Sequence, residues 1–141
     1  MSYCATEEGT ARYRDKFKNT LARDHFRDSQ KLWMSSIGFG SYLGSHNEST
    51  DIRYRDAVVR AVELGCNNID TAINYRFQRS ERSIGAALEI LFKDGKASRD
   101  EIIIATKGGY IPFDGAPPRD INTYFVETFV KPGIATFEDI A

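Results

Sequence analysis

The chain has 141 residues, which suits one ordinary domain. Its formal net charge is −1 and its isoelectric point is about 6.1, so the sequence indicates no polybasic face for binding nucleic acid or anionic lipid. Hydrophobic residues make up 41% of the sequence, enough for a packed core and too many for a disordered chain. No apolar run approaches the ~20 residues of a membrane span. Cys4 and Cys66 form no CxxC pair, so we expect a protein of the reducing cytoplasm, with Cys66 as a buried thiol.

The first predicted elements are a short helix and three short strands. Residues 7–22 carry an apolar side chain at every fourth position from Tyr13, which predicts an amphipathic helix. Residues 25–40 then predict a strand, a turn at Ser29-Gln30, a second strand and a third one.

A helix and a strand are predicted next. Thr50 or Asp51 is suited to cap the amino end of the helix, and Gly65 supplies its end. Residues 66–69 are too few for a helix and predict a buried strand.

A further helix and strand complete the regular part of the chain. Ser80 is predicted to cap the helix and Gly95 to end it. The residues predicted to face the core are Ile84, Leu88, Leu91 and Phe92. Residues 101–108 hold three consecutive isoleucines and form the clearest strand. This alternation of strands and helices predicts a parallel α/β sheet, because each connection is long enough for a right-handed crossover.

The residues after this strand lack a clear period. The segment 108–135 is rich in glycine, proline and aromatic residues, which predicts a long loop that packs, with a short helix near 120–130. Residues 136–139 look like the start of a helix, with a capping threonine and acidic residues behind it. Because the chain stops two residues later, we expect it to be a fragment.

Three polar residues stand where predicted strands end. Asp70 closes one strand, Tyr75 lies in the loop after it, and Lys107 closes the next strand. The carboxyl ends of parallel strands meet at one edge of a sheet, so we expect the three to converge. A lysine ammonium stabilises a phenolate, and a carboxylate keeps the lysine charged. The trio predicts a phenol that donates a proton to a developing alkoxide, the acid half of a carbonyl reduction whose hydride comes from a cofactor such as nicotinamide.

Each of the three residues has a structural alternative by itself. Asp70 could bond its own backbone in a turn, Tyr75 could be a packing aromatic, and Lys107 could be a solvated strand end. Their occurrence together at neighbouring strand ends favours a site over three separate structural roles.

Other motifs are weaker. Residues 38–43 resemble GxGxxG, but Leu43 replaces the third glycine and no acidic residue follows at the Rossmann spacing, so we reject a dinucleotide fingerprint. His25 and His46 lack partners at ligand spacing, which argues against zinc. The charged runs RYRD, RFQRSER and SRDE are predicted to be solvated surface.

Four motifs, in order, resemble the N-terminal part of an aldo-keto reductase over roughly residues 24–109: IGFGSYLG, AVVRAVELGCNNIDTAINY, SERSIGAALEIL and EIIIATKGG. The resemblance implies an α/β fold that is a truncated (β/α)8 TIM barrel, with an N-terminal hairpin at about residues 25–35 and about three βα units. It also implies an oxidoreductase that uses NADP, or NAD, on carbonyl, alcohol or sugar substrates.

The resemblance assigns roles to individual residues. Tyr75 would be the general acid and base, Lys107 would stabilise its phenolate, and Asp70 would support the lysine. The implied cofactor-binding residues are Gly40, Ser41, Tyr42 and Asp70, and no metal is implied.

The sequence also departs from the family. The family's fourth catalytic residue is a histidine at the end of the fourth strand, and both histidines here precede the second strand. A whole barrel needs ~250 residues, so we expect this chain to have little activity by itself. The expected organisation is an arm over residues 1–23 and a partial barrel over 24–141, in which the loop 108–135 covers the site.

Two other functions stay open. Lys107 could form a Schiff base in an aldolase or lyase, although an ion pair with Asp70 would leave less free amine. A partial barrel could also be a non-catalytic binding or regulatory module. For a reductase, the expected partner is a small carbonyl compound or sugar, with no nucleic acid and no membrane, and the oligomeric state is not fixed by the sequence.

Overall fold

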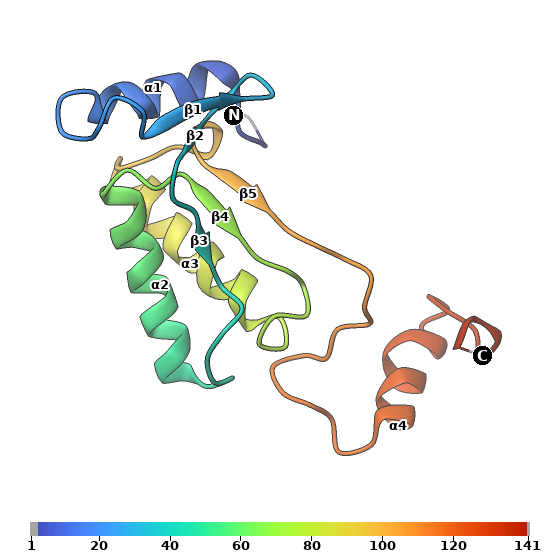
Figure 1. The fold of residues 1–141 in the computed structure, drawn as a ribbon. Coiled ribbons are helices and arrows are strands. Elements are labelled where there is room, and N and C mark those ends of the chain that lie inside the picture. The colour runs from blue at the N-terminus through green and yellow to red at the C-terminus, as the bar shows by residue number, and fades with distance from the viewer. Residues whose placement is uncertain (1–2, 141) are drawn as a thin grey trace.

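The computed structural model describes residues 3–140 and shows a mixed α/β fold (Figure 1). Its helices are α1 (Glu7–Phe17), α2 (Glu48–Glu63), α3 (Arg79–Lys93) and α4 (Ile121–Phe125). Its strands are β1 (Phe26–Ser29), β2 (Leu32–Ser35), β3 (Phe39–Gly40), β4 (Asn68–Asp70) and β5 (Ile103–Ala105). Within the described residues, no helix is both long and apolar enough to cross a membrane.

Strands β3, β4 and β5 form a parallel sheet in that order, which confirms the predicted alternation of strands and helices. The register pairs Phe39 with Ile69 and Ile69 with Ile104. α2 and α3 cover one face of this sheet (Figure 1), and Ile69 packs among their side chains. Because successive side chains of a strand point to opposite faces, Asp70 lies on the face that these helices leave open.

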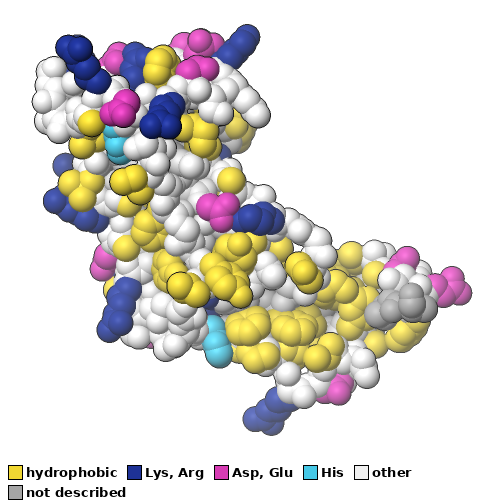
Figure 2. Space-filling view, viewed as in Figure 1, with side chains coloured by type: hydrophobic (Ala, Val, Ile, Leu, Met, Phe, Trp, Pro, Cys, Tyr) yellow, Lys and Arg dark blue, Asp and Glu magenta, His cyan; other side chains and the backbone are white. Residues whose placement is uncertain are grey.

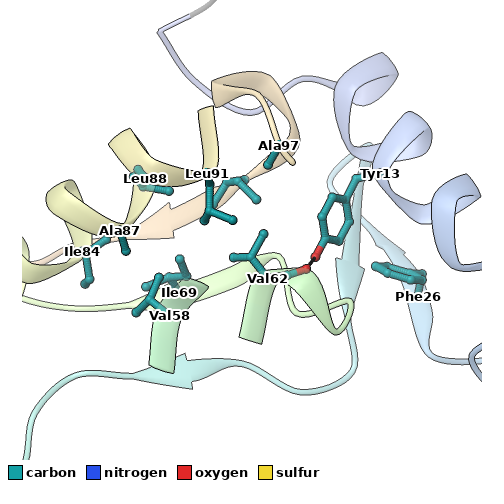
Figure 3. Close-up of a cluster of buried hydrophobic side chains, with 11 residues drawn as sticks. Tyr13, Phe26, Val58, Val62, Ile69, Ile84, Ala87, Leu88, Leu91 and Ala97 are labelled. Carbon is teal, nitrogen blue, oxygen red and sulfur yellow. Dashed lines mark hydrogen bonds between the residues drawn. The ribbon is translucent and has the colours of Figure 1, made fainter. Parts of the chain in front are cut away.

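The core lies between the sheet and these two helices. Figure 3 shows side chains of α2 and α3 converging with Ile69. The predicted stripe is confirmed at Ile84, Leu88 and Leu91, which are at most 9% exposed, whereas Phe92 is only half-buried. Full burial of one such side chain contributes about 1.5–3 kcal/mol, so this layer is the main source of stability for the sheet.

Helix α1 is attached to the core through Tyr13. The Tyr13 side chain is buried, donates its hydroxyl to the Val62 carbonyl, and packs edge-on against Phe26 with ring centroids 5.9 Å apart (Figure 3). Burial raises the pKa of this phenol. The helix ends at Phe17, earlier than predicted, and Leu21 still packs against the core from the turn that follows.

The β1–β2 hairpin lies across the end of the sheet at which the parallel strands begin (Figure 1). Its turn is at Gln30-Lys31, where φ is 53° and 66°, one residue later than predicted. Two consecutive residues with positive φ match the right-handed twist of a tight hairpin.

Asn67, just before β4, joins this hairpin to the sheet. Its side chain is fully buried, and its oxygen accepts the Ser35 N–H at 2.9 Å. Its amide nitrogen donates to the carbonyls of Trp33 at 2.9 Å and Glu101 at 3.3 Å. One side chain thus satisfies backbone groups from β2 and from the segment that leads into β5.

The amino ends of α2 and α3 differ from the prediction. Asn47 caps α2 by accepting the Thr50 N–H at 3.0 Å, so the helix begins earlier than expected. α3 has Gln78 at the cap position, with φ of 70° and no side-chain cap. Ser80, the predicted cap, is instead buried, and its hydroxyl donates to a carbonyl just after β3.

Two of the charged runs predicted to be solvated carry buried groups. The Arg76 side chain is 1% exposed and forms an ion pair with Asp51. The Glu101 side chain is 2% exposed and binds Arg12 at 3.0 Å and Lys16 at 2.8 Å, both from α1. The prediction was wrong here because the partners lie far away in the sequence.

Two predicted strands are shifted or shortened. β4 includes Asp70 and leaves out Cys66, whose thiol is half-buried rather than fully buried. β5 covers only Ile103–Ala105: a 3-10 turn, η1 (Arg99–Glu101), occupies the start of the predicted range, and residues 106–108 lie beyond the strand.

The segment after β5 forms its own small unit beyond the carboxyl ends of the strands (Figure 1). α4 continues into a π-helical turn, η2 (Val126–Val130), which confirms a short helix near 120–130. A last 3-10 turn, η3 (Glu138–Ile140), begins where the predicted helix start lies.

Candidate active site

The end of β4 and the residues after β5 run side by side past the sheet. The Thr71 N–H donates to the Ala105 carbonyl at 2.8 Å, and the Ile73 N–H donates to the Lys107 carbonyl at 3.2 Å. These bonds bring Asp70 and Lys107 together although 37 positions separate them. The Lys107 Nζ lies 2.7 Å from Asp70 Oδ1 and 2.8 Å from the Thr71 carbonyl oxygen.

Tyr75 stands at the start of an unusual turn. Arg76, Phe77 and Gln78 have φ of 50°, 58° and 70°, a left-handed run that non-glycine residues adopt rarely. Such conformations persist only where surrounding contacts hold them, and they cluster at functional sites. The turn leaves the Tyr75 ring beside Lys107, whose Nζ is 5.0 Å from the ring centroid.

The structure therefore brings together the three residues singled out in the sequence. The pKa of Lys107 is raised, mainly because its ammonium group donates a hydrogen bond to Asp70. Desolvation lowers this pKa in part, and the interaction with Tyr75 raises it again. The lysine is held as a cation between a carboxylate and a phenol. About half of each ion-pair side chain remains exposed, 49% for Lys107 and 51% for Asp70, so a ligand can reach the group.

Gly40, Ser41 and Tyr42 lie beside this group, in three different environments. Gly40 pairs with Asp70 in the register, and a Cβ at Gly40 would meet no atom within 4 Å. Ser41 is fully buried, and both its N–H and its hydroxyl donate to the Asp70 carbonyl at 3.1 Å. Tyr42 is 67% exposed, and its ring stands edge-on to that of Tyr75 with centroids 5.0 Å apart.

The row that contains Asp70 has small neighbours on both sides. Asp70 pairs with Gly40 on β3 and with Ala105 on β5. Neither neighbour has a side chain large enough to fill the space beside the carboxylate. This row lies on the open face of the sheet. The row therefore forms a flat surface with room for a planar ring next to Asp70.

The sequence reading missed the residues that hold the Tyr75 turn. The Arg76 guanidinium binds Asp51 of α2, donates to the Ser45 carbonyl at 3.0 Å, and lies over the Tyr54 ring at 4.8 Å. An arginine directly after the tyrosine was the available signal, but its partners come from a distant segment.

Two further contacts fix the strand ends. Thr106 donates its hydroxyl to the Glu81 carboxylate of α3, which holds the residue before Lys107. Ser80 donates to the Ser41 carbonyl at 2.6 Å, which holds the chain after β3. Both anchors come from the first turn of α3, so this helix end positions two of the three strand ends.

Comparison with known families gives one match. The model described as the aldo/keto reductase family matches residues 36–136, a range that contains Asp70, Tyr75 and Lys107. This match confirms the resemblance drawn from the sequence motifs. A search of curated proteins gave no match.

Proposed function

The chain belongs to the aldo/keto reductase family, and we propose that Tyr75, Lys107 and Asp70 form the proton-transfer site of a carbonyl reductase. At the level of the family, this is an oxidoreductase. The observation that carries the proposal is the position of the Lys107 ammonium, 2.7 Å from the Asp70 carboxylate and 5.0 Å from the centre of the Tyr75 ring.

The three residues would share the work of moving one proton. The Tyr75 hydroxyl donates its proton to the oxygen of the substrate carbonyl as that oxygen gains negative charge. The Lys107 ammonium stabilises the phenolate that remains, and Asp70 keeps the lysine charged and in place. In the direction of alcohol oxidation, the phenolate takes the proton back.

Members of this family generally use nicotinamide cofactors, and we propose NADP, with NAD as the alternative. The cofactor would supply the hydride. Gly40, Ser41, Tyr42 and Asp70 are proposed to hold its nicotinamide end. The open space at Gly40 and the small Ala105 support this assignment, because a flat ring needs a surface without a protruding side chain. The buried Ser41 would act by holding the Asp70 backbone, and the exposed Tyr42 by offering its ring.

We also propose that the fold is the N-terminal part of a (β/α)8 barrel. The parallel sheet with helices on one face supports this proposal, and so does the hairpin across the amino ends of its strands. In this proposal residues 24–141 belong to the barrel, and the segment 108–135 lies near the site at the carboxyl ends of the strands.

The raised pKa of Lys107 weighs against the Schiff-base alternative. A lysine that attacks a carbonyl must be a free amine, and such lysines are found in apolar pockets or near other cations. Lys107 instead bonds a carboxylate and is half exposed. These surroundings favour a permanent cation over a nucleophile.

The test compares Tyr75→Phe with Tyr110→Phe. Tyr110 is 75% exposed in the segment after β5, so its variant is the matched control. We expect the full chain to bind NADPH in a fluorescence titration, and both variants to bind it equally. In a protein that carries this chain within a whole barrel, Tyr75→Phe should lose about 100-fold or more of the NADPH-dependent reduction of an aldehyde, the usual contribution of a general acid, because the chain by itself is expected to have little activity. A wild-type chain that binds no NADPH, or turnover of the whole barrel that Tyr75→Phe leaves intact, would refute the proposal.

A further inference from the structure

The turn after Tyr75 adopts a backbone conformation that its residues do not favour by themselves. Arg76, Phe77 and Gln78 all have positive φ, and none of them is a glycine. Such a run costs conformational free energy, so contacts from outside the turn must keep it in place. The position of the Tyr75 ring therefore depends on groups that the turn itself does not contain.

The far end of the turn is held by the segment after β5. Figure 2 shows hydrophobic side chains gathered over this segment. Phe77 stacks on Phe113 with ring centroids 6.3 Å apart, and the Gln78 amide donates to the Phe113 carbonyl at 3.1 Å. These contacts fasten the second and third residues of the run. They leave Arg76, the residue next to Tyr75, to be held from the opposite side.

Arg76 is held by a buried ion pair. Its side chain is 1% exposed, and its Nη2 donates to Oδ1 of Asp51 in the first turn of α2. Its Nε donates to the Ser45 carbonyl at 3.0 Å, whereas its Nη1 makes no hydrogen bond to any described residue. Among the described residues, Asp51 is the one carboxylate that pairs with this guanidinium. A buried cation with a single charged partner depends strongly on that partner.

The same carboxylate also binds the other end of the turn. Oδ2 of Asp51 accepts from Nη1 of Arg79, the first residue of α3. Asp51 therefore joins one residue at the start of the left-handed run to the residue that directly follows it. The two bonds fix the separation of the two ends of the turn, and they attach the turn to α2.

Helix α2 is a firm support for this attachment. Its Val58 and Val62 are at most 1% exposed in the core. An acidic residue in the first turn of a helix also has a structural role of its own, because it stabilises the helix dipole. Glu48 provides the same charge in the same turn, but it is exposed and is not among the partners of Arg76. The contact with the Tyr75 turn thus distinguishes Asp51 from Glu48.

We infer that Asp51 is a positioning residue for Tyr75: acting through Arg76, it holds the turn so that the phenol stays beside Lys107. The role of the phenol as general acid rests on the proposed reductase function, while the placement of the ring does not. The Tyr75 ring centroid lies 5.0 Å from the Lys107 Nζ and 5.0 Å from the Tyr42 ring centroid. A misplacement of only about 1 Å can cost a reaction a large factor in rate.

The first test follows the Tyr75 ring in the full chain by NMR, with labelled tyrosine and phenylalanine rings. Tyr75→Phe identifies the Tyr75 signals. The nuclear Overhauser cross-peak between Tyr75 and Tyr42 reports the position of the phenol. The cross-peak between Tyr13 and Phe26, whose ring centroids are 5.9 Å apart in the core, reports in the same sample that the fold is intact.

Asp51→Asn removes the charge with little change of shape, and Glu48→Gln is the matched control in the same helical turn. Cross-peak intensity falls with the inverse sixth power of distance, so a shift of about 1 Å from 5.0 Å should lower the Tyr75–Tyr42 cross-peak about threefold in Asp51→Asn. The core cross-peak should stay, and Glu48→Gln should change neither. A Tyr75–Tyr42 cross-peak that Asp51→Asn leaves unchanged, or that Glu48→Gln lowers equally, would overturn the inference.

Two variants of Arg76 test the path of the effect. Arg76→Lys keeps the cation but loses the fork that reaches Asp51 and the Ser45 carbonyl together, so it should lower the Tyr75–Tyr42 cross-peak as well. This variant decides the matter if Asp51→Asn does not fold. Arg76→Gly gives the turn a residue that adopts positive φ freely and has no guanidinium to hold. In that background Asp51→Asn should keep less than about a third of its effect on the cross-peak, and a full effect there would contradict action through Arg76.

A second test measures turnover in a protein that carries this chain within a whole barrel. Asp51→Asn should lower kcat for an aldehyde about tenfold or more while KM and the affinity for NADPH change less than about twofold, because substrate binding does not use the Tyr75 proton. Glu48→Gln should keep the wild-type kcat.

The two proposals fail separately. If Asp51→Asn lowers the Tyr75–Tyr42 cross-peak but Tyr75→Phe keeps full turnover, the positioning role is supported and the reductase function is not. If Tyr75→Phe loses turnover but Asp51→Asn changes neither the cross-peak nor kcat, the reductase function stands and the positioning role is wrong.

Discussion

Replacement of Asn67 by alanine should strongly destabilise the protein, because this side chain joins the hairpin to the parallel sheet. It accepts the Ser35 N–H at 2.9 Å and donates to the carbonyls of Trp33 at 2.9 Å and Glu101 at 3.3 Å. The residue is fully buried, so water does not replace these bonds without entering the core. Asn67→Ala removes all three bonds in one step.

The size of the effect follows from these contacts. A net loss of about 1 kcal/mol for each hydrogen bond gives about 3 kcal/mol. The Ser35 N–H left without a partner adds about 1–2 kcal/mol. The 3.3 Å bond to Glu101 is the weakest, and water that enters the truncated site recovers part of the loss. We therefore expect the free energy of unfolding to fall by about 3–5 kcal/mol, a large share of the 5–15 kcal/mol typical of a domain.

The matched control is Asn68→Ala, the same chemical change one position later. Asn68 is half-buried, and its side-chain amide makes no hydrogen bond to any described residue, so its loss should cost less than about 1 kcal/mol. Urea unfolding followed by circular dichroism measures both variants. The fluorescence of Trp33, the chain's one tryptophan, reports on the hairpin in the same samples.

A third variant separates bonding from size. Asn67→Asp keeps the shape and the acceptor for the Ser35 N–H, but it puts a carboxylate oxygen where the amide donated to two carbonyls. It should be at least as destabilising as Asn67→Ala. The reasoning fails if Asn67→Ala costs less than about 1 kcal/mol, or no more than Asn68→Ala.

Two further predictions concern charged side chains that the fold pairs with partners. Asp51→Asn should lower the free energy of unfolding by about 2–4 kcal/mol, because the buried Arg76 guanidinium loses its charged partner. The control is Asp56→Asn, which changes an exposed ion pair. An Asp51→Asn variant that is destabilised no more than Asp56→Asn would count against this prediction. Hydrogen bonding from Ser98 is the main cause that lowers the pKa of Asp100 below its usual 3.8. The free energy of unfolding should therefore be higher for wild type than for Asp100→Asn above pH 3.8, and this difference should disappear as the pH falls through the lowered pKa. Urea unfolding of both proteins at several pH values measures the difference. A difference that grows on acidification would contradict this sign.

Local patterns in the sequence were enough to predict the strands, the helices and their order. Ile84, Leu88 and Leu91 are spaced to lie on one side of a helix, and they are buried in the structure. Alternation of strands and helices implies a parallel sheet, and a parallel sheet places the ends of neighbouring strands together. For this reason the meeting of Asp70 and Lys107 was predictable without coordinates, as the 2.7 Å contact bears out.

Only the tertiary structure decided which polar residues are buried and what they bind. Arg76 and Glu101 lie in charged runs that the sequence predicts to be solvated, yet each is buried against partners distant along the chain. Asn67 lies in a predicted buried strand, but its spacing does not show that it binds Trp33 and Glu101. The same holds for Ser80, whose hydroxyl bonds the chain after β3 and does not cap its own helix. A polar group can be buried only where a partner meets it, and that meeting depends on the packing of whole elements, which no local spacing records.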